Sequence, residues 1–150
     1  MSTHYQGTET ERVALDAYIK LSRAADAVSA RINHHLKEVN LTISQFGVLE
    51  ALYHLGPLHQ NELGEKILKT GGNMTLVIDN LVKRGVVCRE RDEDDRRFIT
   101  VHLTEAGQNL IQDLFPRHVR VVVQEMGALT QEEQAQLAAL CRKIGLSEPV

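Results

Sequence analysis

The chain has 150 residues, with 17 Lys and Arg against 20 Asp and Glu, 7 His, 2 Cys and no Trp, and its formal net charge is −3. This composition is typical of a single compact globular unit. Cys88 and Cys141 are too few and too widely spaced for a disulfide scaffold. No apolar run reaches the roughly 20 residues that span a bilayer, and the polar N-terminus lacks a signal peptide's hydrophobic stretch, so we expect a cytoplasmic protein.

The charges are unevenly distributed along the chain. Residues 66–97 carry eight basic against six acidic side chains, whereas the rest of the chain is acidic. A locally basic segment of this kind favours contact with an anionic partner, although the net charge alone does not indicate one.

Residues 11–39 contain neither Gly nor Pro, and their apolar positions recur at close to a heptad spacing. The pattern predicts one helix roughly 40 Å long. Because this exceeds the diameter of a small domain, we expect part of its apolar stripe to pack on another subunit, with a wholly intramolecular helix as the alternative. The stripe consists of Leu15, Tyr18, Ile19, Ala25, Val28, Ile32, Leu36 and Val39.

The next segment predicts three shorter helices. Thr42 and Ser44 can cap the first of them, and Gly56-Pro57 ends it, with Phe46, Leu49, Leu52 and Leu55 on one face. Residues 60–68 form the second, a turn follows at Thr70-Gly71-Gly72, and residues 73–84 form the third. Two short helices joined by a tight turn containing Gly are typical of a helix-turn-helix.

After Gly85 the apolar pattern changes to alternation, which predicts strands at 86–91 and 98–103 joined by a charged tip at 92–97. A helix capped by Thr104 then follows, in which Pro116 should remove one backbone hydrogen bond and produce a kink. The sequence from Thr130 to Glu133 is a capping box that opens the last helix.

A helix-turn-helix followed directly by a hairpin predicts a winged-helix module, and the fold class is mainly α (α+β). In the helix 73–84, the spacing of Met74, Val77, Ile78 and Leu81 predicts a buried face. The opposite face is expected to contact DNA. Its expected major-groove residues are Asn73, Thr75, Leu76 and Asn80, and Lys83 suits a phosphate. Asp79 either accepts from a cytosine amino group or orients Arg84 or Lys83.

The hairpin tip ends in Asp95-Arg96-Arg97. A guanidinium on a stiff arm is attracted by the negative potential of a narrow minor groove. We therefore expect Arg96 and Arg97 to contact DNA from the wing, with Asp95 holding one of them in place.

These motifs and their order resemble the MarR family of transcriptional regulators over nearly the whole chain. The matching segments are Thr75–Arg84 with Gly85-Val86-Val87, the Asp95-Arg96-Arg97 tip, Leu103-Thr104-Glu105-Ala106-Gly107, and Leu129-Thr130 through Lys143-Ile144-Gly145. The chain departs from the family at His59, where Ser or Thr is frequent, and at Asp79, where a neutral or basic residue is common.

The resemblance implies one MarR-type unit over 1–150, an obligate homodimer with dimerisation helices at 11–39 and 104–146, and a DNA-binding lobe at 42–103. It implies repression at a pseudo-palindromic operator, released by a small ligand, often a phenolic or other aromatic anion. By approximate position, the effector pocket is expected at Arg31, His34, His35, Phe46 and Tyr53. No cofactor or metal is expected.

Four other functions remain as alternatives. A metal sensor would have His34 or His35 meet His118 from another helix, and a redox sensor would use Cys88 beside Arg89. An enzyme is disfavoured because no nucleophile elbow, phosphate loop or metal-ligand spacing occurs. A helical interaction protein that does not bind DNA would be distinguished by the absence of salt-dependent DNA binding.

Overall fold

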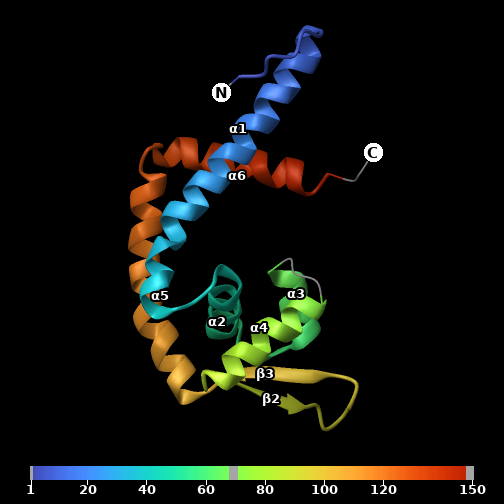
Figure 1. Cartoon of the computed structure of the whole chain (residues 1–150), viewed down its shortest axis with the longest axis vertical. Helices are drawn as coiled ribbons and strands as arrows, with labels where there is room; N and C mark the ends of the chain where they lie inside the picture. The colour runs from blue at the N-terminus through green and yellow to red at the C-terminus, as the bar shows by residue number, and fades with distance from the viewer. Residues whose placement is uncertain (1, 68–70, 148–150) are drawn as a thin grey trace. The chain divides into compact units, whose positions relative to one another are not determined.

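The structure is a computed structural model that describes residues 2–67 and 71–147 (Figure 1). These residues form two compact units: a helical unit of residues 2–34 and 120–147, and a winged-helix unit of residues 35–119 without 68–70. In chain order the elements are α1 (Glu9–Ile32), η1 (Asn33–Val39, a 3-10 helix), α2 (Ile43–Leu55), β1 (Leu58–His59), α3 (Gln60–Lys66), α4 (Gly71–Lys83), β2 (Val87–Arg91), β3 (Ile99–Leu103), α5 (Glu105–Met126) and α6 (Gln131–Gly145). None of the helices in the described ranges combines the length and apolar character needed to cross a membrane.

The winged-helix unit contains a three-stranded antiparallel sheet in the order β1-β3-β2. The hairpin of β2 and β3 has the predicted position, with Arg89 opposite Val101. The two-residue strand β1 was not predicted, and it pairs His59 with Thr100 on the outer side of β3. Three helices of this unit, α2, α3 and α4, contact one another and the sheet, so the predicted winged helix-turn-helix is confirmed.

The core of the winged-helix unit is aliphatic, as the small number of aromatic residues requires. Its most completely buried side chains are Leu36, Leu49, Leu63, Met74, Ile78, Leu81, Ile111, Leu114, Val48, Val87 and Val101. The unit therefore extends beyond residues 42–103, since Leu36 comes from η1, and Ile111 and Leu114 come from the first half of α5. On α2, Leu55 is 57% exposed and does not share the buried face of Leu49 and Leu52.

The prediction of one continuous helix over residues 11–39 is wrong at its C-terminal end. The α-helix stops at Ile32, where the Asn33 side-chain amide donates to the carbonyl oxygen of Ser29 at 2.8 Å. An Asn side chain competes in this way with the backbone hydrogen bonds of a helix. The chain continues as the 3-10 helix η1, which ends before Asn40 with its positive φ of 55°.

The predicted turn at Thr70-Gly71-Gly72 is also wrong within the described residues. Helix α4 begins at Gly71, so Gly71 and Gly72 are helical, whereas Thr70 lies outside the described residues. Gly in a helix costs about 1 kcal/mol relative to Ala but does not forbid helical backbone angles. Packing of the buried α4 face can offset that cost. Helix α3 ends earlier than predicted, at Lys66, with Ile67 as its C-cap.

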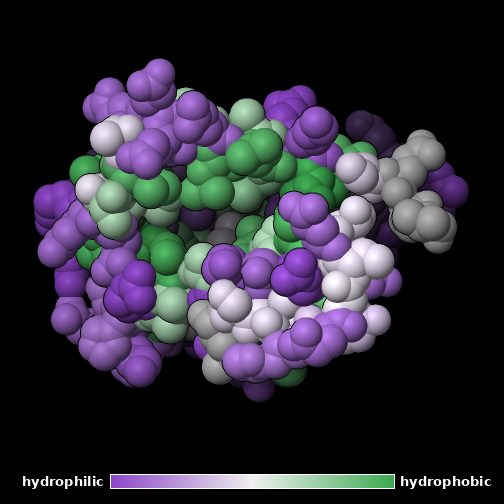
Figure 2. Space-filling view, turned by 90° about the horizontal axis from the view of Figure 1, so that it is seen from above, coloured by the Kyte–Doolittle hydropathy of each residue, from purple (hydrophilic) through white to green (hydrophobic). Residues whose placement is uncertain are grey.

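The helical unit contrasts with this packed core, because neither α1 nor α6 has a buried residue. Large apolar side chains remain exposed on both helices, among them Tyr18 (68%), Leu140 (64%) and Ile144 (64%). Figure 2 shows hydrophobic side chains at the surface among hydrophilic ones. The capping box predicted at Thr130 is present, and α5 continues as one helix through Pro116.

Candidate DNA-binding surface

Helix α4 has the two faces that its sequence predicts. Met74, Ile78 and Leu81 are each at most 1% exposed, and Val77 is partly buried against the core. The side chains on the opposite face reach solvent, namely those of Asn73, Thr75, Leu76, Asn80 and Lys83. Leu76 is 60% exposed although it is apolar. This face therefore offers amide, hydroxyl, methyl and ammonium groups together, which are the groups that contact base edges and phosphates.

Arg89 of β2 links the wing to the helix-turn-helix. Its guanidinium contacts Asp79 Oδ1 at 2.5 Å, donates to the carbonyl oxygen of Thr75 at 3.1 Å and to Gln60 Oε1 at 3.2 Å. Gln60 in turn donates through Nε2 to Thr75 Oγ1 at 3.1 Å. One arginine thus connects β2 with the start of α3 and with α4.

The partner predicted for Asp79 within the protein is therefore wrong, whereas the alternative contact with a cytosine amino group stays a prediction. Asp79 binds Arg89 rather than Arg84 or Lys83, because Arg89 approaches from the neighbouring strand β2. Arg84 points elsewhere and donates to the backbone carbonyl groups of Val39, the last residue of η1, and of Asn40. Sequence spacing along one helix could not reveal a partner that comes from a strand ten residues later.

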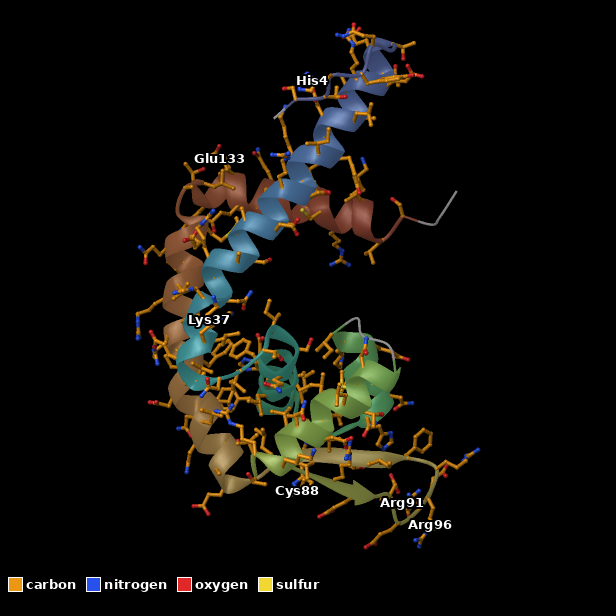
Figure 3. All side chains as sticks on the ribbon, viewed as in Figure 1. His4, Lys37, Cys88, Arg91, Arg96 and Glu133 are labelled. Carbon is orange, nitrogen blue, oxygen red and sulfur yellow. The ribbon has the colours of Figure 1, made fainter. Side chains whose placement is uncertain are left out.

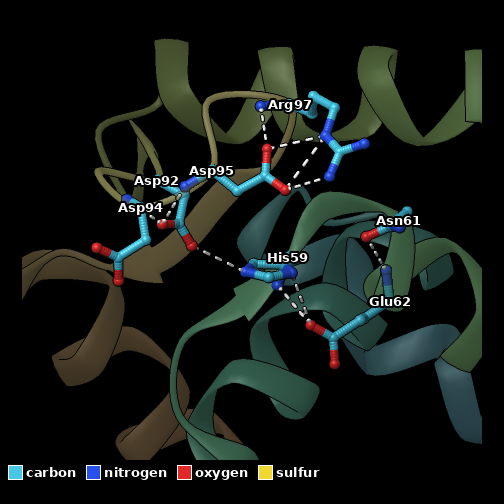
Figure 4. Close-up of polar contacts among 7 residues, drawn as sticks. All are labelled: His59, Asn61, Glu62, Asp92, Asp94, Asp95 and Arg97. Carbon is cyan, nitrogen blue, oxygen red and sulfur yellow. Dashed lines mark hydrogen bonds and ion pairs between the residues drawn. The ribbon is translucent and has the colours of Figure 1, made fainter.

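The wing tip is held by a compact set of hydrogen bonds (Figure 4). Asp92 Oδ1 accepts from the backbone N–H groups of Asp94 at 2.9 Å and Asp95 at 3.2 Å. Across the tip, the Asp92 N–H donates to the Phe98 carbonyl at 3.0 Å. Asp92 thus acts as the turn-forming residue of the tip, and the backbone hydrogen bonds to it hold its pKa below the usual value.

Asp95 holds Arg97, as the sequence predicts. The guanidinium approaches both carboxylate oxygens, with Nη2 at 2.6 Å from Oδ2 and Nε at 2.9 Å from Oδ1. These hydrogen bonds lower the pKa of Asp95 and raise that of Arg97. The Arg97 side chain is still 85% exposed, so it is oriented and accessible at once.

Arg96 lies beside Arg91 at the same end of the hairpin (Figure 3). Arg91 Nη1 donates to the Arg96 carbonyl oxygen at 2.5 Å, which braces the backbone of the tip, and the Arg96 side chain is exposed. Sequence analysis missed Arg91 as a supporting residue, although its position at the end of the alternating pattern was a usable signal.

Two grooves run along α4 on the winged-helix unit. The larger has a volume of about 560 Å³ and lies between α3, α4 and the wing, lined in part by Gln60, Thr75 and Arg97. The smaller, of about 300 Å³, lies between the start of α2 and α4, lined in part by Ser44, Asn73 and Asn80. Four of the residues predicted to contact DNA therefore line concave surface on the two sides of α4: Asn73, Thr75, Leu76 and Asn80.

The residues predicted for an effector pocket belong to both units. Arg31 and His34 lie in the helical unit, where Arg31 Nε contacts Glu125 Oε2 at 2.7 Å. His35, Phe46 and Tyr53 lie in the winged-helix unit, and the rings of His35 and Phe46 meet edge to face with centroids 6.4 Å apart. Tyr53 belongs to a neighbouring ring group with His54 and Phe115.

His35 and His118 meet, as the metal-sensor alternative requires. Nε2 of His35 lies 3.0 Å from Nδ1 of His118, and His35 is 9% exposed with its Nδ1 buried and unpartnered. Burial lowers the pKa of both imidazoles, and the adjacent His118 lowers that of His35 further. Within the described residues, however, no group of three potential metal ligands occurs. Cys88 is half-buried on β2, and both thiols are free.

Comparison with known proteins places the chain in a family. A family model described as transcriptional regulator SarA/Rot matches residues 31–114. The Bacillus subtilis protein YkoM, named an HTH-type transcriptional regulator, is 34% identical over 146 residues, which cover 97% of this chain and 94% of the relative.

Two solved structures share the fold. Sco3205, a MarR family transcriptional regulator from Streptomyces coelicolor in complex with DNA, superposes with a TM-score of 0.83 at 22% identity, over 96% of this chain and 91% of that one. Bordetella bronchiseptica BpsR, whose DNA binding is regulated by 6-hydroxynicotinic acid, superposes with a TM-score of 0.81 at 24% identity, over 96% and 100%.

The winged helix-turn-helix and these relatives define a class, the DNA-binding transcriptional regulators. The chain belongs to the SarA/Rot family of transcriptional regulators and is a regulator of the MarR type. These relatives are regulators rather than enzymes.

Proposed function

We propose that the protein is a homodimeric repressor that binds a pseudo-palindromic operator and is released from it by a small aromatic anion. The observation that carries the DNA-binding part is the exposed polar face of α4, beside a wing whose Arg97 is held by Asp95 yet 85% exposed. A helix for the major groove and an oriented guanidinium for the flanking minor groove are the two elements by which winged-helix proteins read DNA.

Each residue of this surface has a proposed role. Asn73 and Asn80 offer amides that match adenine, and Thr75 and Leu76 offer methyl groups for thymine. Lys83 contacts a phosphate, Arg96 and Arg97 contact the minor groove or its phosphates, and Asp95 supports Arg97. The charge-assisted contacts supply affinity, whereas the α4 contacts supply sequence preference.

Homodimerisation is proposed from the exposed apolar side chains of α1 and α6. Tyr18, Leu140 and Ile144 are all more than 60% exposed, and neither helix has a buried residue. A monomer would leave this surface in water, and self-association through two-fold symmetry is the commonest way to cover such a surface. Two α4 helices in one dimer would then read two half-sites.

Effector release is proposed from Arg31, His34, His35, Phe46 and Tyr53, which supply cationic, polar and aromatic groups. A hydroxylated aromatic acid matches these groups, since rings pack on rings and a carboxylate binds a guanidinium. Regulation of BpsR by 6-hydroxynicotinic acid supports this ligand class. A ligand that favours one spacing of the two α4 helices by ~2 to 3 kcal/mol would weaken operator binding about 30- to 150-fold.

Metal sensing is the second candidate, because His35 and His118 place two imidazole nitrogens 3.0 Å apart. Imidazole is a common ligand of zinc, although a structural zinc site usually has four ligands. The two candidates differ in which compound releases the DNA.

The test of DNA binding uses duplexes that the protein selects from a random-sequence pool, with affinity measured by fluorescence anisotropy at several salt concentrations. Arg97→Ala is expected to weaken binding and to reduce the salt slope by about 1 for each lost phosphate contact. Arg142→Ala, an exposed arginine in the last turn of α6, is the matched control and should leave both unchanged. A parent protein without salt-dependent DNA binding would refute the proposal.

The effector test titrates phenolic acids, quinones and zinc against the same complex, for the parent and for Arg31→Ala. Release by an aromatic acid that Arg31→Ala resists supports the effector proposal. Release by zinc alone, lost in His118→Gln, would replace it with the metal sensor.

A further inference from the structure

His59 joins the start of α3 to the base of the wing tip. Its ring stacks on Phe98 with centroids 4.7 Å apart and planes 11° from parallel. Nδ1 lies 3.4 Å from Glu62 Oε1, and Nε2 lies 3.4 Å from Asp92 Oδ2 (Figure 4). We propose that His59 is a positioning residue that holds the wing in its DNA-binding position, and that operator affinity rises when its imidazole is protonated. This inference rests on the proposed DNA-binding function.

The backbone fixes where the His59 ring can lie. His59 is in β1, paired with Thr100 of β3, and its N–H donates to Glu62 Oε1 at 3.1 Å. It is therefore tied to the sheet on one side and to the first turn of α3 on the other. Its side chain is 32% exposed, which leaves the ring open to protons from solvent while most of it is covered.

From the ring, two short connections lead to Arg97. The first passes through Asp92, whose Oδ1 accepts from the N–H of Asp95 at 3.2 Å. The second passes through Phe98, whose N–H donates to the Asp95 carbonyl at 3.1 Å. Asp95 then holds the Arg97 guanidinium at 2.6 Å, and that guanidinium also lies 5.9 Å from the centroid of the Phe98 ring. Displacement of the His59 ring would therefore disturb both supports of Arg97.

Carboxylates face the His59 ring from two elements. Glu62 faces it from α3, and Asp92 and Asp95 interact with it from the tip, whereas the cation on that side, Arg97, is already bound by Asp95. Hydrogen bonds from the backbone N–H groups of Asp95 and Asp94 lower the pKa of Asp92, and its interaction with His59 lowers it further. The carboxylates thus remain ionised over the range in which an imidazole changes charge.

Protonation changes affinity because Arg97 reaches DNA only when the wing is held in its DNA-binding position. The apparent dissociation constant of a site increases as the fraction of molecules in the binding-competent conformation falls. A charged imidazole can donate to both Glu62 and Asp92 and raises the fraction of molecules with the wing in this position, whereas a neutral imidazole has one N–H and can donate to only one of them. Affinity should therefore be lower where an imidazole is neutral than where it is charged.

The experiment measures the affinity for a selected duplex at about pH 6 and about pH 8, at constant ionic strength, for the parent, His59→Gln and Asp92→Asn. We expect the parent to bind about three- to fivefold more tightly at the lower pH through this contact, the size expected for a partly exposed ion pair. His59→Gln should lose that part of the pH dependence, and Asp92→Asn should reduce it while keeping the oxygen that accepts the tip hydrogen bonds.

His102→Gln is the matched control. His102 lies on β3, also in the sheet, but it pairs with Cys88 of β2, and its Nε2 lies 3.2 Å from Glu90 Oε1. This variant should retain the pH dependence of the parent. A His59→Gln protein with the same affinity ratio as the parent, or loss of the ratio in His102→Gln, would overturn the proposal.

A second readout needs no DNA and separates failure of this inference from failure of the proposed function. The NMR signal of the Arg97 Nε–H group is followed against pH in the parent and in His59→Gln. In the parent, we expect the Arg97 Nε–H signal to shift with pH together with the signals of the His59 ring protons. In His59→Gln, this shift should be absent. If the parent binds no duplex but this coupling is present, the wing role stands and the DNA-binding proposal fails. If the parent binds duplex without the coupling, only the present inference fails.

Discussion

The two units bury their apolar side chains to very different extents. In the winged-helix unit Leu49, Ile78 and Val101 are fully buried, whereas in the helical unit Tyr18 is 68% and Leu140 is 64% exposed. Apolar burial is the main favourable term in folding. The contrast therefore teaches that the winged-helix unit contains its own core, whereas α1 and α6 of the helical unit leave large apolar side chains exposed.

The largest expected effect is on stability, and it comes from a substitution in the core of the winged-helix unit. Leu49→Ala should lower the free energy of unfolding by about 2 to 5 kcal/mol, because it removes buried methyl groups and leaves a cavity. Leu55→Ala on the same helix α2 is the control, since Leu55 is 57% exposed and should cost less than about 0.5 kcal/mol. Urea unfolding monitored by circular dichroism measures both. Equal losses would contradict the placement of the core on this face of α2.

The second prediction breaks the proposed dimer. Leu140→Glu should shift the protein from dimer to monomer and weaken operator binding at least about tenfold, because a carboxylate would be desolvated in the proposed interface. Leu55→Glu is the matched control, since this exposed leucine is in the winged-helix unit. Sedimentation velocity reports the oligomeric state. A Leu140→Glu protein that stays dimeric would mean that α6 does not form the interface.

The third prediction concerns the link between the wing and α4. Arg89→Ala should weaken operator binding about tenfold, since it removes charge-assisted hydrogen bonds that are each worth roughly 1.5 to 3 kcal/mol and leaves Asp79 unpaired. Arg89→Lys should recover only part of the loss, because an ammonium group cannot contact Asp79, Thr75 and Gln60 in the same planar arrangement. If Arg89→Lys binds the operator as tightly as the parent, a positive charge at this position is sufficient and the planar hydrogen-bond arrangement is not needed.

The smallest effect is the pH dependence of stability. The pKa values of His35 and His118 are lowered in the folded protein, mainly by burial, so the unfolded chain binds more protons between the folded and unfolded values. The contribution of the two imidazoles to stability is complete above the pKa that they have in the unfolded chain. It is lost as the pH falls through about 6.5 toward the pKa of the folded protein. His118→Gln should show a smaller decrease of Tm on acidification than the parent. An equal decrease would assign the effect to other groups.

Sequence analysis predicted much of the winged-helix unit correctly. The periodicity of Met74, Ile78 and Leu81 identified the buried face of α4, and the alternation after Gly85 gave the hairpin. Asp95 was expected to hold one of the two tip arginines, and it holds Arg97. Each of these depends on neighbours within a few positions in the chain. Whether the exposed face of α4 contacts DNA, and whether the effector residues form a pocket, stay predictions.

Sequence reasoning failed where the position or partner of a residue depends on packing against distant parts of the chain. The periodic pattern could not show that Asn33 ends α1 while Leu36, a few residues later, enters the core of the winged-helix unit. It offered Asp79 a cytosine amino group, Arg84 or Lys83 as a partner but not Arg89, and it identified His59 only as a departure from a family pattern.

What the sequence by itself determined are most of the elements, the buried face of α4 and the support of a tip arginine by Asp95, because helix periodicity, strand alternation and turn chemistry act over a few residues. Only the tertiary structure decided that Arg89 binds Asp79, that His35 meets His118, and that His59 stacks between α3 and the wing. Such contacts depend on which surfaces the folded core brings together. A long-range pairing of side chains leaves no periodic trace in a single sequence.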